Sequence, residues 1–342
     1  MLHVLVLLLA AGATAPTTPA PPSATPPVTA PPPRETRSLP LMGTVFDVSL
    51  PAGRADAFDA VFAVFADVDA KMSEWKEGSP LAEVNRAAGM RAVAVPADLR
   101  ALLHRSVGLA ALTGGAFEPT WAALWGLWDF KAQPPHVPDP VAVKAAVLLI
   151  DYRDIAIDDV AGTVRLARSG MKIGLGGIAK GWALDRAAEA LRARGVSTFL
   201  LSAGGQVYAG GNNGGVPWKV GVRDPRGGPD EFFAVIEVTD VSVSTSGDYE
   251  RYFDVDGVRY HHILDPKTGM PSRGLRCATV IAADATLADA LSTAVMVLGR
   301  DQGLALVERL PGVQALVVDD LGKVSTSSGL KSQLHVLRAP RP

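Results

Sequence analysis

The chain of 342 residues contains a single cysteine, Cys277. One thiol cannot form an internal disulfide, and it cannot build a cysteine-rich metal site. Cys277 lies in an apolar segment, residues 276–281, where we expect it to be a small buried side chain of a strand. The sequence therefore predicts neither a disulfide framework nor a thiolate metal centre.

The chain also lacks an excess of either positive or negative charge. The formal net charge is −2, and no run of basic residues stands out. Binding to nucleic acid or to an anionic membrane surface relies on clustered positive charge, so neither is favoured as a partner. The hydrophobic content of 48% is ample for a large core.

The N-terminal apolar run, residues 4–11, is too short to cross a bilayer. Small residues follow it, and Ala11-Gly12-Ala13 matches the signal-peptidase pattern, so residues 1–13 are predicted to be a signal peptide. An uncleaved anchor is the alternative, because the positively charged start is weak. No cysteine follows the run, which excludes a lipoprotein. We expect export to the periplasm or cell envelope.

Residues 14–36 are rich in Pro, Ala and Thr and are predicted to be a disordered tether. One domain is expected over residues 37–338, with no repeat. Apolar spacing and Gly or Pro punctuation predict its elements. The helices are 56–72, 96–113, 178–194, 287–298 and 302–310. The strands are 44–50, 198–203, 218–222, 232–238, 241–245 and 313–318, and Asp256-Gly257 predicts a hairpin turn. Helices and strands are mixed without strict alternation, so the fold class is α+β.

Residues 172–181, Lys-Ile-Gly-Leu-Gly-Gly-Ile-Ala-Lys-Gly, form the most informative motif. Glycine lets a ligand approach the backbone closely, and a helix N-terminus offers unpaired N–H groups to phosphate oxygens. The pattern matches neither a Rossmann fingerprint nor a P-loop. A tight turn without ligand is an equally good interpretation of the spacing alone.

Asp289 and Thr293 lie four residues apart on a predicted helix, and therefore on one face. A carboxylate and a hydroxyl can share a hard cation such as Mg²⁺, provided that phosphate oxygens complete the coordination shell. Taken alone, this pair is more simply explained as two polar residues at a solvated edge.

His261 and His262 follow a predicted strand, so at most one of them is expected to face a cleft. A neutral imidazole in a cleft is a credible general base, although a structural histidine is the simpler interpretation. Asp248, at the end of another strand, is the alternative base. Four tryptophans, namely Trp75, Trp121, Trp125 and Trp128, can stack on a flat ring, and packing is the simpler interpretation for three of them.

In combination, these segments resemble the ApbE family, flavin transferases that attach FMN from FAD to protein threonines. The motifs keep the family order over residues 40–320. They are Met42-Gly43-Thr44, residues 72–75 with Ser79 and Asn85, residues 115–120, the loop 176–181 with Asp185, residues 202–205 with Gly210, residues 244–249, residues 262–269 and residues 288–294.

The resemblance implies a single α+β domain of the ApbE type, with mixed sheets and packed helices. It implies Mg²⁺ held by Asp289, Thr293 and the backbone carbonyl of Gly177, and a catalytic base for which His262 is the first candidate and Asp248 the second. The FAD site then includes Met42, Trp75, Ala116, Phe117, Glu118, Gly174, Lys180 and Ile263. The partners implied are FAD and an acceptor protein with a threonine motif, typically a membrane redox complex subunit.

The chain departs from the family pattern at Gly174, where an aspartate is usual at the flavin site. Trp75 and Glu118 replace a usual Tyr and Asp but conserve the ring and the charge. We therefore expect Gly174→Asp to tighten FAD binding. Two other functions stay open at this point: an FAD pyrophosphatase that yields FMN and AMP, and a non-catalytic periplasmic flavin-binding protein.

Overall fold

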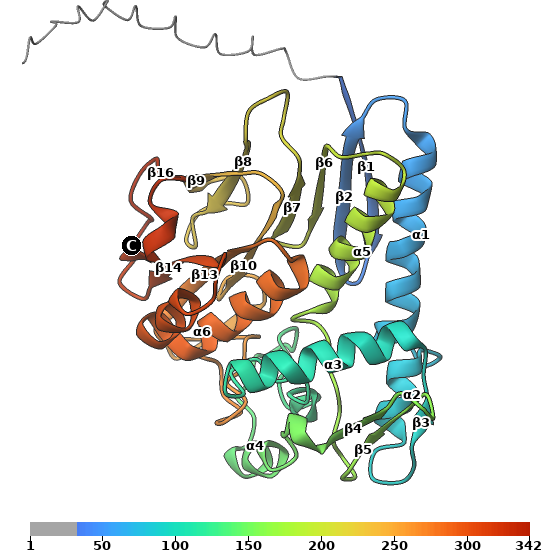
Figure 1. Ribbon diagram of the computed structural model, residues 1–342. Coiled ribbons are helices and arrows are strands. Elements are labelled where there is room, and N and C mark those ends of the chain that lie inside the picture. Colours follow the sequence, from blue (N-terminus) through green and yellow to red (C-terminus); the bar gives the residue numbers. More distant parts are fainter. Residues whose placement is uncertain (1–32) are drawn as a thin grey trace, which may run out of the picture.

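The computed structural model describes residues 33–342, and its centre is an eight-stranded antiparallel sheet (Figure 1). In spatial order its strands are β1 (Arg34–Leu41), β2 (Thr44–Pro51), β6 (Phe199–Ala203), β7 (Gln206–Gly210), β10 (Val241–Gly247), β13 (Leu275–Ala282), β14 (Gln314–Asp319) and β15 (Val324–Thr326). Neighbours such as β2 and β6 are far apart in sequence, so the sheet brings distant motifs together.

The predicted signal peptide lies outside the described residues, as does most of the predicted tether. β1 begins at Arg34, so the last residues of the tether, expected to run to residue 36, belong to the sheet instead. Within residues 33–342, no helix is both long and apolar enough to span a membrane.

Helices cover one face of the sheet: α1 (Ala55–Met72), α5 (Ala179–Ala193) and α6 (Ala285–Glu308). The apolar spacing that predicts α1 is borne out by Phe58, Val61 and Phe65, which are fully buried. Gly299 has a non-helical φ of 76° inside α6. This kink divides α6 at the point where the sequence predicts one helix to end and another to follow.

A second, three-stranded sheet covers the other face. It consists of β16 (Leu334–Val336), β9 (Phe232–Val238) and β8 (Trp218–Arg223). Every residue of β13 is buried, because Cys277 packs toward the small sheet while Ala278 packs toward α6. The expectation of a buried Cys277 is confirmed.

The remaining elements lie mostly in the lower part of the molecule in Figure 1. They are α2 (Pro80–Arg86), α3 (Ala97–Leu112), η1 (Ala122–Leu124), α4 (Pro140–Val147), η2 (Tyr152–Asp154), the sheet β3-β5-β4 (Val93–Ala94, Thr163–Leu166, Ile155–Asp158), the hairpin β11-β12 (Tyr252–Val255, Val258–His261) and η3 (Ser328–Leu330). Asp256 and Gly257 have φ of 52° and 74°, as the predicted type I′ turn requires.

Candidate functional site

The glycine loop is held in place from α2. The side chain of Asn85 forms two hydrogen bonds with the backbone of Ile173, accepting from its N–H at 2.7 Å and donating to its carbonyl at 2.9 Å. Ser79 caps α2 by accepting from the Ala82 N–H at 3.0 Å. Ser79 therefore stabilises the start of α2, and Asn85 on that helix fixes the backbone of Ile173 at the start of the glycine loop.

Close packing of α5 on α6 sets the rest of the site. A Cβ on Gly181 would lie 2.2 Å from the carbonyl oxygen of Ala285, so only glycine allows the two helices to approach this closely. Asp185, one turn further along α5, accepts from the N–H groups of Ala285 and Thr286, both at 2.8 Å. These contacts bring the start of α5 against the first turns of α6.

Asp289 lies at this junction and is only 4% exposed. One carboxylate oxygen accepts from the Gly181 N–H at 3.0 Å, and the other lies 3.5 Å from Nζ of Lys180. Lys180 also donates to the carbonyl of Gly176 at 2.9 Å. The simpler interpretation of Asp289 as a residue at a solvated edge is therefore wrong.

Thr293 faces the same loop, because its Oγ1 lies 3.2 Å from the position that a Cβ on Gly177 would take. The aromatic ring of Phe117 approaches that position to 3.6 Å. Within residues 33–342, no group of three or more His, Cys, Asp or Glu residues is arranged to hold a metal. A carboxylate, a hydroxyl and a carbonyl nevertheless are the hard oxygen donors that suit Mg²⁺ when phosphate oxygens are added.

The two histidines have different surroundings. His261 is buried, with Nε2 2.9 Å from the Ser272 carbonyl and Nδ1 accepting from the Ile263 N–H at 3.3 Å, which is a structural role. Nδ1 of His262 is buried without a hydrogen-bond partner among residues 33–342. Burial, with Arg251, His261 and Lys180 nearby, lowers the pKa of His262 to about 4. His262 is therefore a neutral imidazole with a free ring nitrogen at neutral pH.

Asp248, the alternative base, is buried in an ion pair. Two nitrogens of the Arg226 guanidinium donate to its two carboxylate oxygens, at 2.7 and 2.8 Å. Both oxygens of the Asp248 carboxylate are therefore already engaged by the guanidinium. The geometry favours His262 over Asp248 as the base.

Of the four tryptophans named above, Trp75 is exposed, and the other three pack against aromatic neighbours, as the sequence predicts. Trp75 is 72% exposed and stacks on Trp125, with ring centroids 4.3 Å apart. Trp121 meets the Trp125 ring edge-on, and Trp128 packs in a cluster with Phe253 and Tyr260. Trp75 is thus the aromatic surface available to a flat ligand.

The segment of residues 116–118 is buried beside the loop. Glu118 accepts from the N–H and hydroxyl of Thr120 at 2.9 and 2.7 Å and from the Tyr152 N–H at 3.1 Å. Burial raises the pKa of this carboxyl. Because these contacts are internal, the carboxylate of Glu118 braces the segment, and its predicted place in the FAD site stays a prediction.

Two further predicted residues lie in the turn between β1 and β2 and just after the end of β12. Met42 has a φ of 50° and forms, with Gly43, the two-residue turn between β1 and β2. A Cβ on Gly43 would lie 3.5 Å from the guanidinium of Arg251. Ile263 is buried directly after His262.

Gly174 requires a correction. Its φ lies outside the left-handed region, but a Cβ would lie 3.0 Å from both Nε1 of Trp121 and Cβ of Ala122. Nε1 of Trp121 also donates to the Gly174 carbonyl at 3.0 Å. The indole crowds the place of a side chain at position 174, so Gly174→Asp must shift Trp121, and on this geometry we expect it to weaken FAD binding rather than tighten it.

Sequence reasoning missed Glu74 and Arg251. Burial raises the pKa of Glu74 to about 7, while the N–H groups of Glu74 and Leu175, and then Lys180 and Arg251, favour its charged form. Glu74 stands within a motif that the resemblance uses, beside Trp75, but no spacing rule identifies it.

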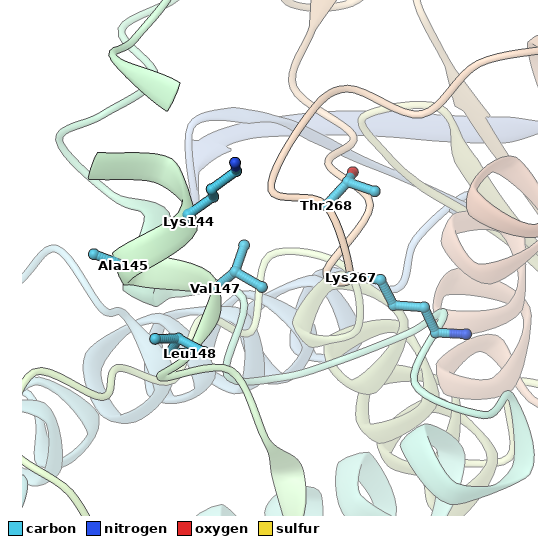
Figure 2. Close-up of a pocket in the computed structure, with 6 residues that line it drawn as sticks. All are labelled: Lys144, Ala145, Val147, Leu148, Lys267 and Thr268. Carbon is cyan, nitrogen blue, oxygen red and sulfur yellow. The ribbon is translucent and has the colours of Figure 1, made fainter. Parts of the chain in front are cut away.

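Two of the hollows formed by residues 33–342 differ in the residues that line them. The larger, of about 590 Å³, lies between α4 and the loop after β12 and contains none of the predicted site residues (Figure 2). It is lined by Lys144, Ala145, Val147, Leu148, Lys267 and Thr268. The smaller, of about 310 Å³, includes Glu74, Trp75, Asn85 and Trp125. The smaller hollow is the one that joins the exposed aromatic ring to the loop.

Comparison with known proteins agrees with this geometry. A model of the ApbE family matches residues 42–317. An FAD:protein FMN transferase of Treponema pallidum is 38% identical over 298 residues, covering 83% of this chain and 82% of the relative. One from Vibrio cholerae is 30% identical, over 85% and 90% of the two chains. The crystal structure of the ApbE protein of Thermotoga maritima superimposes with a TM-score of 0.80 at 36% identity, covering 90% of this chain and 100% of that one.

Proposed function

This chain belongs to the ApbE family and is an FAD:protein FMN transferase, and from that premise we propose the chemistry of its site: Mg²⁺-dependent transfer of FMN to a threonine hydroxyl of an acceptor protein, with release of AMP. The observation that carries this proposal is the convergence of Asp289, Thr293 and the glycine loop at the α5–α6 junction. Together they offer hard oxygen donors and a helix N-terminus to a diphosphate.

The proposed reaction breaks one bond and forms one. The threonine oxygen attacks the phosphorus on the FMN side of the diphosphate, and the bond from that phosphorus to the bridging oxygen breaks. AMP leaves with the bridging oxygen, and the threonine proton passes to the neutral imidazole of His262. His262 suits this role because its Nδ1 has no other partner among the described residues.

The binding residues act through charge and position. Lys180, anchored by the Gly176 carbonyl, places an ammonium group where it can contact phosphate oxygens. Mg²⁺, when bound by Asp289, Thr293 and the Gly177 carbonyl, would neutralise charge on the diphosphate and polarise the phosphorus. Trp75 offers an exposed ring on which the isoalloxazine can stack.

We also propose the setting of the reaction. The predicted signal peptide of residues 1–13 and the absence of a lipid-accepting cysteine favour an exported, non-lipidated protein of the periplasm or cell envelope. The acceptor proposed is a threonine-bearing subunit of a membrane redox complex.

Replacing Asp289 tests the proposed metal site. Asp289→Ala and the isosteric Asp289→Asn should lower FMN transfer by about two orders of magnitude or more, because Lewis-acid stabilisation contributes several kcal/mol. In-gel flavin fluorescence of the acceptor at limiting Mg²⁺ measures this loss. Asp301→Asn, an exposed change on the same helix, should leave transfer unchanged. Full activity in both Asp289 variants would show that the metal is bound elsewhere.

A further inference from the structure

Glu74 brings a carboxylate to the glycine loop at Gly176. Its Oε1 lies 3.9 Å from the position that a Cβ on Gly176 would take, and the Leu175 N–H faces the carboxylate. No Lys or Arg nitrogen within residues 33–342 lies within ion-pair distance of Glu74, although Lys180 and Arg251 are near enough to favour its charged form. Glu74 is therefore an acceptor that is not saturated by protein cations.

A second polar atom of the same hollow lacks a partner. Nε1 of Trp125 is buried and forms no hydrogen bond within the described part of the chain. Glu74 and Trp125 both line the hollow of about 310 Å³. Trp75, which directly follows Glu74 in the sequence, has an exposed ring that stacks on Trp125. A buried N–H without a partner is costly, so a ligand that accepts from it gains free energy.

The hollow thus combines a flat aromatic surface with the Glu74 acceptor and the unused Trp125 donor, and its lining also includes the charged side chains of Glu77, Arg86 and Lys172. An oxidised isoalloxazine ring carries these features in complementary form. Its pyrimidine edge presents one N–H donor, at N3, between two carbonyl acceptors, whereas its dimethylbenzene edge has neither. Burial raises the pKa of Glu74 to about 7, so the carboxyl is ionised above neutral pH. In that form it only accepts, and it therefore pairs with the N–H and not with the carbonyls.

We propose that Glu74 and Trp125 recognise the pyrimidine edge of the flavin, with Glu74 accepting from N3–H and Trp125 donating to a neighbouring ring carbonyl. The inference rests on FAD being the substrate, as proposed above. In this chain Trp121 crowds the position of Gly174, and Glu74 supplies a carboxylate to the loop at Gly176. Glu74 and Trp125 are positioning residues that fix the flavin, and with it the diphosphate, relative to Asp289.

A flavin without the N3 proton tests the inference. FAD and 3-methyl-FAD are titrated into the full chain, and the Kd is measured by fluorescence quenching. The wild type should bind FAD at least about tenfold more tightly than 3-methyl-FAD, because a hydrogen bond to a charged group is lost and a methyl group meets the carboxylate. Glu74→Ala should weaken FAD binding by a similar factor and abolish the discrimination.

Two further variants separate this role from general effects. Glu74→Gln conserves shape and an acceptor oxygen, so it should retain part of the discrimination. Glu77→Gln changes charge at the rim of the same hollow and should retain all of it. Undiminished discrimination in Glu74→Ala, or none in the wild type, would overturn the inference. A chain that discriminates between the two flavins yet transfers no FMN would instead refute the proposed function alone.

Discussion

At the residue scale, the site depends on groups whose charge is set by their surroundings. His262 is neutral because burial and two nearby cations, Arg251 and Lys180, oppose its protonation. The same cations attract a diphosphate. Substrate binding therefore adds negative charge beside an imidazole that is about to accept a proton, which couples binding to the basicity of His262.

This coupling predicts a measurable pKa change. In the free protein the His262 ring should stay neutral from pH 8 down to about pH 5, because its pKa of about 4 lies below the ordinary value of 6.5. FAD, added with a chelator to prevent turnover, should raise that pKa by about 1 or more, since opposite charge favours the imidazolium. Histidine NMR titration with His262→Gln for assignment measures both values. A free-state midpoint near 6.5 would contradict the role of burial.

Gly174 gives a second prediction at this scale. Gly174→Asp should raise the Kd for FAD about tenfold, or about 1.4 kcal/mol, because its side chain must displace the Trp121 indole that binds the Gly174 carbonyl. In the double variant with Trp121→Ala the steric conflict is removed, so the aspartate should add no further loss to that of Trp121→Ala alone. Tighter FAD binding by the single variant would restore the original expectation from sequence.

The sequence predicts single residues unevenly, for a physical reason. Helical spacing places Asp289 and Thr293 on one face, but spacing alone favours a solvated edge, and only the family resemblance assigns them a metal. The internal role of Glu118 and the closure of Gly174 by Trp121 depend on contacts across the fold, which no local spacing encodes. Glu74 could not be predicted for the same reason, because its proposed role depends on its contact with the glycine loop, which is distant in the sequence.

At the element scale, the site is a junction of helix ends. The N-terminus of α5 lies against the first turns of α6, fixed by Gly181 and by the cap that Asp185 provides. Helices and strands with clear apolar periods were predictable within a few residues, among them α1, α3, α5 and the kink at Gly299. Short elements such as α2, α4 and β3 carry too few periods to be recognised, although α2 holds the loop in place through Asn85.

A pair of glycine substitutions tests the junction. Gly181→Ala should destabilise the fold by about 1–3 kcal/mol and reduce transfer, because its Cβ would lie 2.2 Å from the Ala285 carbonyl oxygen. Gly108→Ala, in α3 with open space around it, should stabilise the protein by about 0.5–1 kcal/mol and leave transfer intact. Urea unfolding measures both. Equal stability of the two variants would mean that the helices do not require this close approach.

At the scale of the whole molecule, the central sheet brings together motifs from both halves of the chain. The glycine loop with the start of α5, and the start of α6, come from distant parts of the sequence and meet where α5 packs against α6 (Figure 1). The order of strands could not be derived from periodicity, since local patterns do not specify which strands pair. The fold class required only the mixture of helices and strands, and it is confirmed.

The most direct test of the account is the fate of FAD. The full chain is incubated with FAD, Mg²⁺ and an acceptor protein carrying the threonine motif, and intact-mass spectrometry of the acceptor is combined with nucleotide chromatography. The account predicts an acceptor heavier by one FMN less one water, with one AMP released per modification. An acceptor whose threonine is replaced by valine should keep its original mass. Free FMN and AMP with an unmodified acceptor would contradict it.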